Sequence, residues 1–285
     1  LNISCLLNIK FKGMKNICIC LKTTAASISE SDIAPLISCF DDAGFSFDEV
    51  RLLYRIDEEK LKKYDERKPG FFASLVKDRD EYLDYLQTAV LDAASEGNCV
   101  LIGRGSYAIL EELENLVSLR FVARDKLRIE RLQKEFDWTE KQAIQRIDES
   151  DANRKGFHKS FFNMDVDDPS HFIMVMNTGL LDVESAANMI VSIVKGYITP
   201  EKEEAGKKKL EQLLQCQHLV NKLIFEYKLN IEFLRAVMED GVITLQGIAD
   251  SSVLVERALK ISSVEFPNYT IKSAISVVQD FKPYS

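Results

Sequence analysis

The sequence predicts an α/β protein with a parallel sheet and helices on both faces, followed by a smaller α+β unit. Along the first 200 residues, short apolar runs alternate with helical patterns, which is the arrangement that produces parallel strands joined by crossover helices. Beyond residue 200 the pattern changes to a long amphipathic helix, a hairpin signal, and one further helix and strand.

Length and composition are those of an ordinary globular chain with room for two cores. The 285 residues are 46% hydrophobic and 29% charged. No apolar run approaches the roughly 18 residues that a membrane span needs, so we expect none. The net charge of −8 argues against a non-specific nucleic-acid binder, and we expect no nucleic-acid partner.

The cysteines and histidines show neither a disulfide pattern nor metal-ligand spacing, and there is no C-x-x-C pair. They are Cys5, Cys18, Cys20, Cys39, Cys99, Cys216, His158, His171 and His218. We therefore expect reduced thiols in a cytoplasmic protein, without a metal site. The opening LNISCLLNIKFKG lacks a basic segment before its apolar patch and is a poor signal peptide, so residues 1–13 are interpreted as an upstream extension.

One shift in composition divides the chain. The stretch ITPEKEEAGKKKLEQ, from Ile198 to Gln212, is charged and carries Pro200 and Gly206. From Thr199 onward there are 11 Lys+Arg and 12 Asp+Glu, a net charge of −1, whereas the remainder, 26 against 33, carries −7. We expect two domains, residues 14–198 and 208–285, joined near residue 200.

The first domain alternates strands and helices. A helix over DRDEYLDYLQTAVLDAASEG has one apolar face and ends at Gly97, and a second helix begins at the capping box Thr139-Glu-Lys-Gln142. That apolar face consists of Leu83, Leu86, Val90 and Ala93. The predicted strands are 16–22, 99–103, 116–123 and 172–178, with a further helix from Asp125. In such sheets ligands bind at the carboxyl ends of the strands.

The turn GRGS, Gly103 to Ser106, directly follows a buried strand. Its glycines allow close backbone approach to a ligand, and Arg104 could hold a phosphate with two donors, although a plain turn fits the same residues.

In ARDKLRIERL, Arg124, Arg128 and Arg131 share one helical face at a strand end. The ordinary alternative is a solvated basic face, since Asp125 and Glu130 lie nearby.

In DESDANRKGFHKSFF, Asp151, Arg154 and His158 stack on one helical side, where a carboxylate could orient arginines. The alternative is a surface ion pair between Asp151 and Arg154 worth only a few tenths of a kcal/mol. We interpret His158 as a bystander.

Taken in order, these segments resemble the cytidylate-kinase-like family of P-loop nucleoside monophosphate kinases, over about residues 97–193. The resemblance implies that lid arginines and a D-x-x-R segment cradle phosphates, a role that falls on Arg128, Arg131, Asp151 and Arg154, with Arg104 at the monophosphate side. It gives Asn177 and Thr178, at the end of the last core strand, a structural role.

The chain departs from the family at its first loop. Where the family has a glycine-rich phosphate loop, this sequence has Lys22-Thr-Thr-Ala-Ala-Ser, so the candidate degenerate loop is Thr23, Thr24, Ala25, Ala26 and Ser27. Without glycine, consecutive N–H groups cannot easily form an anion nest. Lys22 precedes the loop, and Glu30 and Asp32 add negative charge where a triphosphate would lie.

The C-terminal unit predicts an α-β-β-α-β order. A long helix with an apolar face of Leu210, Leu213, Leu214, Val220, Leu223 and Tyr227 precedes a hairpin at Asp240-Gly241, a helix over 253–259 and a strand over 269–278. The sequence EDGVITLQG is similar to the core of the BON domain, and this resemblance implies a membrane or protein partner. The near-neutral charge weakens direct binding to anionic lipid.

Three functions are compatible with these features. The chain could be a weak or inactive kinase relative that binds a nucleotide or another phosphorylated small molecule and has a BON-like interaction module. It could instead be a working cytidylate kinase, which would use ATP and Mg²⁺, or a scaffold that only keeps the fold. The sequence identifies no other cofactor and no catalytic residue, and a homo-oligomer is compatible with all three.

Overall fold

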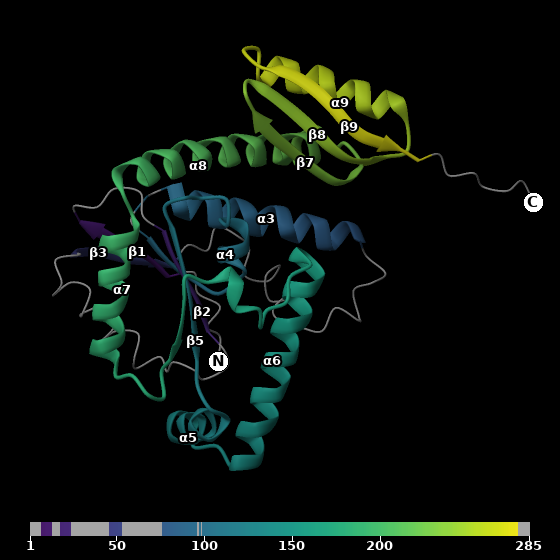
Figure 1. Ribbon diagram of the computed structural model, residues 1–285. Helices are drawn as coiled ribbons and strands as arrows, with labels where there is room; N and C mark the ends of the chain where they lie inside the picture. The colour runs from purple at the N-terminus through teal and green to yellow at the C-terminus, as the bar shows by residue number, and fades with distance from the viewer. Residues whose placement is uncertain are drawn as a thin grey trace, which may run out of the picture.

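The first sheet of the protein is parallel, as predicted. The computed structural model describes residues 7–12, 18–23, 46–52, 76–95, 97 and 99–278, and Figure 1 shows their arrangement. The strand order is β4-β2-β5-β6, with every neighbouring pair parallel. The strands are β2 (Cys18–Thr23), β4 (Cys99–Ile102), β5 (Leu116–Val122) and β6 (Met174–Asn177). The carboxyl ends of β2, β5 and β6 therefore lie at one edge of the sheet.

A two-stranded antiparallel sheet lies beside it, formed by β1 (Leu7–Lys12) and β3 (Ser46–Leu52). The first of these strands lies within residues 1–13, which the sequence had suggested to be an upstream extension. Because residues 7–12 pair with β3 in a regular register on either side of one bulge, that segment takes part in the fold.

The helices of the first domain begin and end at recognisable signals. They are α3 (Val76–Ser95), α4 (Ser106–Ile109), α5 (Asp125–Phe136), α6 (Glu140–Phe162) and α7 (Val183–Tyr197). The predicted capping box is confirmed, because Thr139 and Gln142 bond reciprocally at the start of α6. Figure 1 draws α7 on one side of strands β2 and β5 and α6 on the other.

The C-terminal unit has the predicted element order. Its helices and strands are α8 (Pro200–Asn221), the π-helical turn η3 (Lys222–Glu226), β7 (Ile231–Glu239), β8 (Val242–Ala249), α9 (Ser252–Glu265) and β9 (Thr270–Val277). Strands β7 and β8 are antiparallel, and α9 crosses over so that β9 lies parallel to β8. Asp240 and Gly241 both have positive φ, of 45° and 75°, which is the hairpin geometry that the Asp-Gly pair favours.

Helix α8 packs on both parts of the chain. The charged stretch from Ile198 to Gln212 is helical from Pro200 on, capped by the Thr199 side chain. Leu210, in the first half, is buried in the core that contains α3, whereas Cys216 and Leu219 are buried in the core of the C-terminal unit. One continuous helix therefore joins the two cores. Cys216 is a free thiol, and burial raises its pKa to about 11, which keeps it inert.

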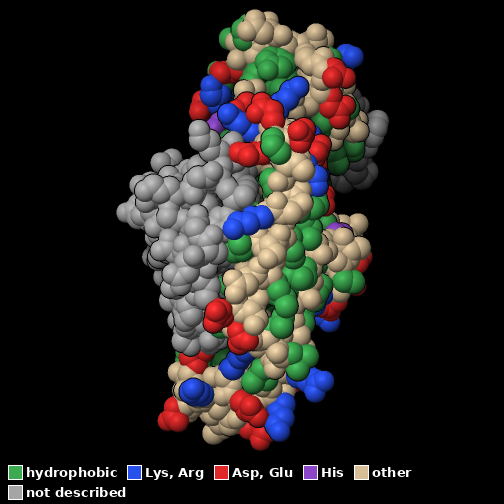
Figure 2. Space-filling model, turned by 60° about the vertical axis from the view of Figure 1, so that its left-hand side comes forward, with side chains coloured by type: hydrophobic (Ala, Val, Ile, Leu, Met, Phe, Trp, Pro, Cys, Tyr) green, Lys and Arg blue, Asp and Glu red, His purple; other side chains and the backbone are tan. Residues whose placement is uncertain are grey.

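The cores and the surface follow the sequence pattern closely. Strand β5 is buried along almost its whole length, as a continuous apolar run predicts. Figure 2, turned so that the α7 side comes forward, shows hydrophobic side chains along the middle of this face and charged side chains gathered toward its ends. Exposed apolar residues include Met189 on α7 and Val175 on the edge strand β6. Among the described residues, no helix is both long and apolar enough to cross a bilayer.

Candidate functional site

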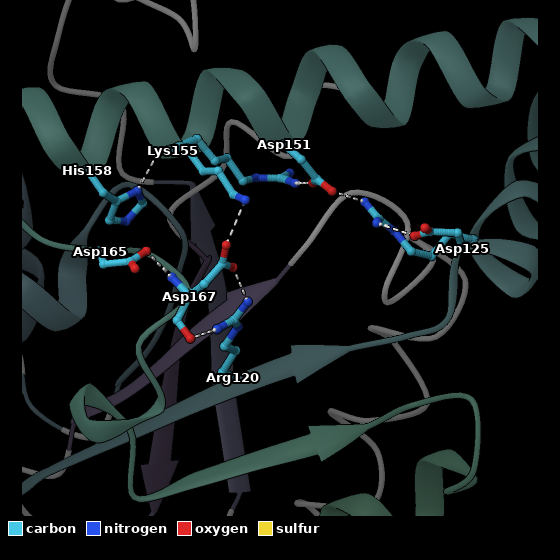
Figure 3. A network of polar contacts seen from close by, with 9 residues as sticks. Arg120, Asp125, Asp151, Lys155, His158, Asp165 and Asp167 are labelled. Atoms are coloured by element: carbon cyan, nitrogen blue, oxygen red, sulfur yellow. Dashed lines mark hydrogen bonds and ion pairs between the residues drawn. The ribbon is translucent and has the colours of Figure 1, made fainter.

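The candidate site is carried by the helical hairpin of α5 and α6, which follows the carboxyl end of β5. The two helices pack through Leu132, Ala143 and Ile147, all of them buried. This packing places residues near the start of α5 opposite the middle of α6. Figure 3 shows the polar side chains that meet across this contact and on the neighbouring strand β5.

Asp151 joins two of the predicted arginines. Its Oδ2 accepts from Nη2 of Arg128 at 2.6 Å, and its Oδ1 accepts from Nη1 of Arg154 at 3.4 Å. The Arg128 side chain is only 6% exposed, so the ion pair is shielded from water on the arginine side. A carboxylate held between two guanidinium groups fixes the direction in which each fork points.

The second partner of Arg128 is far more accessible. Asp125, one turn earlier on α5, accepts from Nη1 of Arg128 at 2.9 Å, and its side chain is 77% exposed. An exposed i, i+3 pair of this kind contributes about 0.5 kcal/mol or less. The contact of Arg128 with Asp125 is therefore more exposed to solvent than its contact with Asp151.

Arg131 turns toward the end of β6. Its Nη1 donates to Oγ1 of Thr178 at 3.1 Å, and its Nη2 donates to the Thr178 carbonyl at 3.0 Å. The Thr178 hydroxyl in turn donates to the carbonyl of Val122 at 3.3 Å. These contacts tie α5 to the carboxyl ends of β5 and β6. The structure thus brings Arg128, Asp151 and Arg154 together and directs Arg131 to Thr178.

Arg104 lies in a turn with unusual backbone geometry. Gly103, Arg104 and Gly105 have φ values of 75°, 54° and 68°, so three successive residues are left-handed. A Cβ on Gly105 would collide with the ring of Phe162 at the end of α6, which explains the glycine. The Arg104 side chain donates to the Tyr82 hydroxyl on α3 at 3.4 Å. The turn therefore aims Arg104 toward α3.

A second polar link connects β5 to α6. Arg120, buried in the middle of β5, donates to the carbonyl and to Oδ1 of Asp167 at 2.9 and 2.6 Å. Oδ2 of Asp167 accepts from Lys155, the residue after Arg154, at 2.8 Å. The hydrogen bond from Lys155 and, less strongly, those from Arg120 hold the pKa of Asp167 below its usual value.

Sequence reasoning did not single out Arg120, Asp167 or Lys155. The signal for Arg120 was present, because a charged residue stood inside the otherwise apolar run LVSLRFVA. A charge in a buried strand requires a partner, and that partner lies 47 residues away.

His158, interpreted from the sequence as a bystander, lies in the core behind Arg154. It is buried, its Nδ1 is 2.9 Å from the Arg154 carbonyl, and its ring stacks on Tyr107 with a centroid distance of 5.6 Å. The side chain packs the C-terminal part of α6 against Tyr107 of α4.

The predicted phosphate loop lies almost entirely outside the described residues. Thr23 is the last residue of β2, paired in register with Phe121 of β5, and Thr24, Ala25, Ala26 and Ser27 follow beyond the described strand. Thr23 itself lies at the same edge of the sheet as the end of β5, which α5 follows. Within the part of the chain that the structure describes, no three His, Cys, Asp or Glu side chains converge as they would around a metal ion.

Residues 45–180 match the model of the Cytidylate kinase-like family. A curated protein from Methanocaldococcus jannaschii, named "Cytidylate kinase", is 29% identical over 154 residues, which are 53% of this chain and 80% of that protein. An uncharacterized protein from Eubacterium ventriosum ATCC 27560, known from its crystal structure, is 19% identical with a TM-score of 0.46, covering 64% of this chain and 99% of its own. Residues 45–180 are therefore similar in sequence to the Cytidylate kinase-like family.

Proposed function

We propose that the chain binds a nucleotide or another phosphorylated small molecule through its arginine cluster, and that it transfers phosphoryl groups slowly or not at all. The observation that carries the proposal is the Asp151 carboxylate held by both Arg128 and Arg154, at 2.6 and 3.4 Å. It lies in a region that matches the Cytidylate kinase-like family. Preorganised guanidinium groups at the edge where ligands of parallel sheets bind are suited to a phosphate.

The charges of the cluster favour an anion. Arg128 and Arg154 contribute two permanent positive charges, which face the carboxylates of Asp125 and Asp151. Arg131, which contacts Thr178, adds a third positive charge on α5. Asp151, whose side chain is 30% exposed, accepts hydrogen bonds from both Arg128 and Arg154 and orients them. The exposed Asp125 is the group that a ligand phosphate would displace from Arg128. Arg131 donates to Thr178 and so links α5 to the end of β6.

Weak catalysis follows from the first loop. Phosphoryl transfer depends almost wholly on positioning and on preorganised positive charge around the β- and γ-phosphates. The segment Thr23 to Ser27 contains no glycine and is not followed by a lysine in the predicted loop. We therefore expect a loop of this sequence to bind a triphosphate poorly. If activity is retained, ATP and Mg²⁺ are the cofactors, and the ion would neutralise charge on the phosphates.

The C-terminal unit is proposed to be a BON-like interaction module with a protein or membrane partner. The support is the sequence EDGVITLQG together with the α-β-β-α-β order of α8, β7, β8, α9 and β9. Its net charge of −1, from 11 Lys+Arg and 12 Asp+Glu, favours a protein over an anionic lipid surface.

A working cytidylate kinase is the second candidate. It is favoured by the Methanocaldococcus jannaschii protein named "Cytidylate kinase", with which the chain shares 29% identity over 154 residues. A scaffold that keeps the fold without a ligand is the third. Ligand binding that depends on the arginines would exclude the scaffold, which has no ligand. A measurement of turnover would then distinguish the working kinase from the weak or inactive binder.

Calorimetric titration tests the binding proposal. We expect the wild-type protein to bind CMP or ATP, each measured with and without Mg²⁺, and Arg154→Met to weaken that binding about 10- to 100-fold, because hydrogen bonds to charged groups contribute about 1.5–3 kcal/mol. Arg257→Met, at an exposed position on α9, is the matched control and should bind as the wild type does. Equal affinities of wild type and Arg154→Met would contradict the assignment of the site.

A further inference from the structure

Helix α3 of the first domain is fastened to α8 by a closed ring of hydrogen bonds. Nε2 of Gln217 donates to Oδ1 of Asp84 at 3.2 Å and to Oδ1 of Asn221 at 3.1 Å. Nδ2 of Asn221 donates to the Thr88 hydroxyl at 2.8 Å, and that hydroxyl donates to the Asp84 carbonyl at 2.7 Å. Two of these bonds join α3 to α8 and two lie within one helix, so Asp84, Thr88, Gln217 and Asn221 form one connected network.

The same helix contacts two further parts of the C-terminal unit. Tyr85 stacks on Phe225 of the π-helical turn, with ring centroids 4.7 Å apart and planes 10° apart. Oδ2 of Asp80 accepts from the backbone N–H of Phe233 in β7 at 3.4 Å. In Figure 1, α3 lies directly beneath α8 and beside β7. The ring of hydrogen bonds is therefore the centre of the contact between the two units.

The ionised form of Asp84 is energetically unfavourable at this position, because the side chain is buried. It is 7% exposed. Burial raises its pKa to about 7, the hydrogen bond from Gln217 opposes that rise, and among charged neighbours Asp80 and Glu81 of α3 raise the pKa while Arg235 of β7 lowers it. The group thus changes charge near neutral pH at the interface itself.

A second polar contact joins the same two helices. Nε2 of His218 on α8 lies 3.7 Å from Oδ1 of Asp92 on α3.

We propose that the contact of α3 with α8 and β7 is a proton-sensitive clasp, which holds the C-terminal unit on the first domain more tightly when Asp84 is protonated and loosens as Asp84 ionises. The inference is independent of what the arginine cluster binds. It makes the attachment of the C-terminal unit depend on pH.

The direction of the pH dependence follows from the coupling of proton binding at Asp84 to closure of the interface. In an opened interface Asp84 meets water and takes its ordinary pKa of 3.8, whereas in the closed interface its pKa is about 7. The closed state binds the proton more tightly, so closure is most favourable at low pH. The equilibrium constant for closure falls by up to about tenfold for each pH unit between about 4 and 7, and changes little above that range.

Hydrogen exchange of the full chain, followed by mass spectrometry, tests the clasp. Peptides covering residues 213–225 are compared between wild type and Asp84→Asn at pH 6 and pH 8. Dividing the two rates at each pH removes the intrinsic pH dependence of exchange and any effect of His218, which both proteins share. We expect the ratio of wild-type to variant exchange to be about tenfold larger at pH 8 than at pH 6.

Two further variants complete the design. Asp148→Asn removes an exposed carboxylate from α6 and should reproduce the wild-type rates at both pH values. Arg235→Gln removes the cation that favours ionised Asp84, so the pH at which the exchange rate of this variant changes should be higher than in the wild type. This test does not depend on whether Asp84→Asn folds. A wild-type to Asp84→Asn ratio that is equal at pH 6 and pH 8, or an Arg235→Gln transition at the wild-type pH, overturns the proposal.

Discussion

Arg128 and Asp151 are paired at 2.6 Å across the hairpin of α5 and α6, although they lie 23 residues apart in the chain. The pair links the helix that follows β5 to the helix that carries Arg154. It therefore determines where two of the four predicted phosphate-binding arginines point, and it is shielded because the Arg128 side chain is 6% exposed.

Asp151→Asn should destabilise the fold by about 1–3 kcal/mol in urea unfolding at pH 7, because it removes the shielded countercharge of Arg128. Asp125→Asn is the matched control. It changes the exposed partner of the same arginine, so its effect should stay within about 0.5 kcal/mol. Equal effects of the two substitutions would show that Asp151 does not orient Arg128.

Gly105→Ala and Gly103→Ala should differ, although both residues are left-handed. At Gly103 an added Cβ meets nothing within 4 Å, so the cost is the backbone strain of about 1–2 kcal/mol. At Gly105 the Cβ would also displace the Phe162 ring, which adds about 1–3 kcal/mol of overpacking. Thermal unfolding of the two variants compares them directly, and a smaller loss for Gly105→Ala would contradict this packing.

Asp167→Asn should reduce stability at pH 7 and have a progressively smaller effect in acid. Hydrogen bonds from Lys155 and Arg120 lower the pKa of Asp167 in the folded protein. The stabilisation is therefore present above the unfolded pKa of about 3.9 and is lost as pH falls through the lower folded value. Urea unfolding at pH 7 and pH 3 measures this loss. An Asp167→Asn effect that stays constant across that range would exclude an ionised Asp167 as the partner of Arg120.

Restoring glycines at Ala25, Ala26 and Ser27 should increase affinity for ATP. Glycine lets successive backbone N–H groups turn toward an anion and removes the Cβ atoms that obstruct its approach. Calorimetric titration with ATP and Mg²⁺ measures the change, and titration with CMP serves as the control because its phosphate is expected at the arginines. If affinity for ATP does not rise, the loop is not a phosphate site in this protein.

Local features of the fold were predictable from the sequence. The capping box of Thr139 and Gln142, the Asp240-Gly241 hairpin and the buried strand β5 depend on neighbouring residues, and each is present in the structure. The apolar face of α3 was predictable in large part, since Leu86, Val90 and Ala93 are buried, whereas Leu83 is only partly buried. The burial of Asp84 on the same helix was not, because it depends on α8, which covers a second side of α3.

Polar contacts between residues far apart in the chain could not be predicted from the sequence. Asp84 meets Gln217 133 residues later, and Arg120 meets Asp167 47 residues later. No periodicity encodes such partners, because their approach depends on how whole helices and strands pack. Helical spacing placed Arg128 and Arg131 on one face, but their contacts separate them, with Arg128 at Asp151 and Arg131 at Thr178.

Steady-state phosphorylation of CMP by ATP and Mg²⁺, followed in a coupled assay, tests the central claim most directly. The protein should show no detectable turnover, or a rate orders of magnitude below that of a competent kinase, since losing even one preorganised donor typically costs about 100- to 1000-fold. UMP, dCMP and AMP are tested as alternative acceptors under the same conditions. Turnover of about one per second or faster, the ordinary range of kinases, would contradict the weak-catalysis account and establish the chain as a working nucleoside monophosphate kinase.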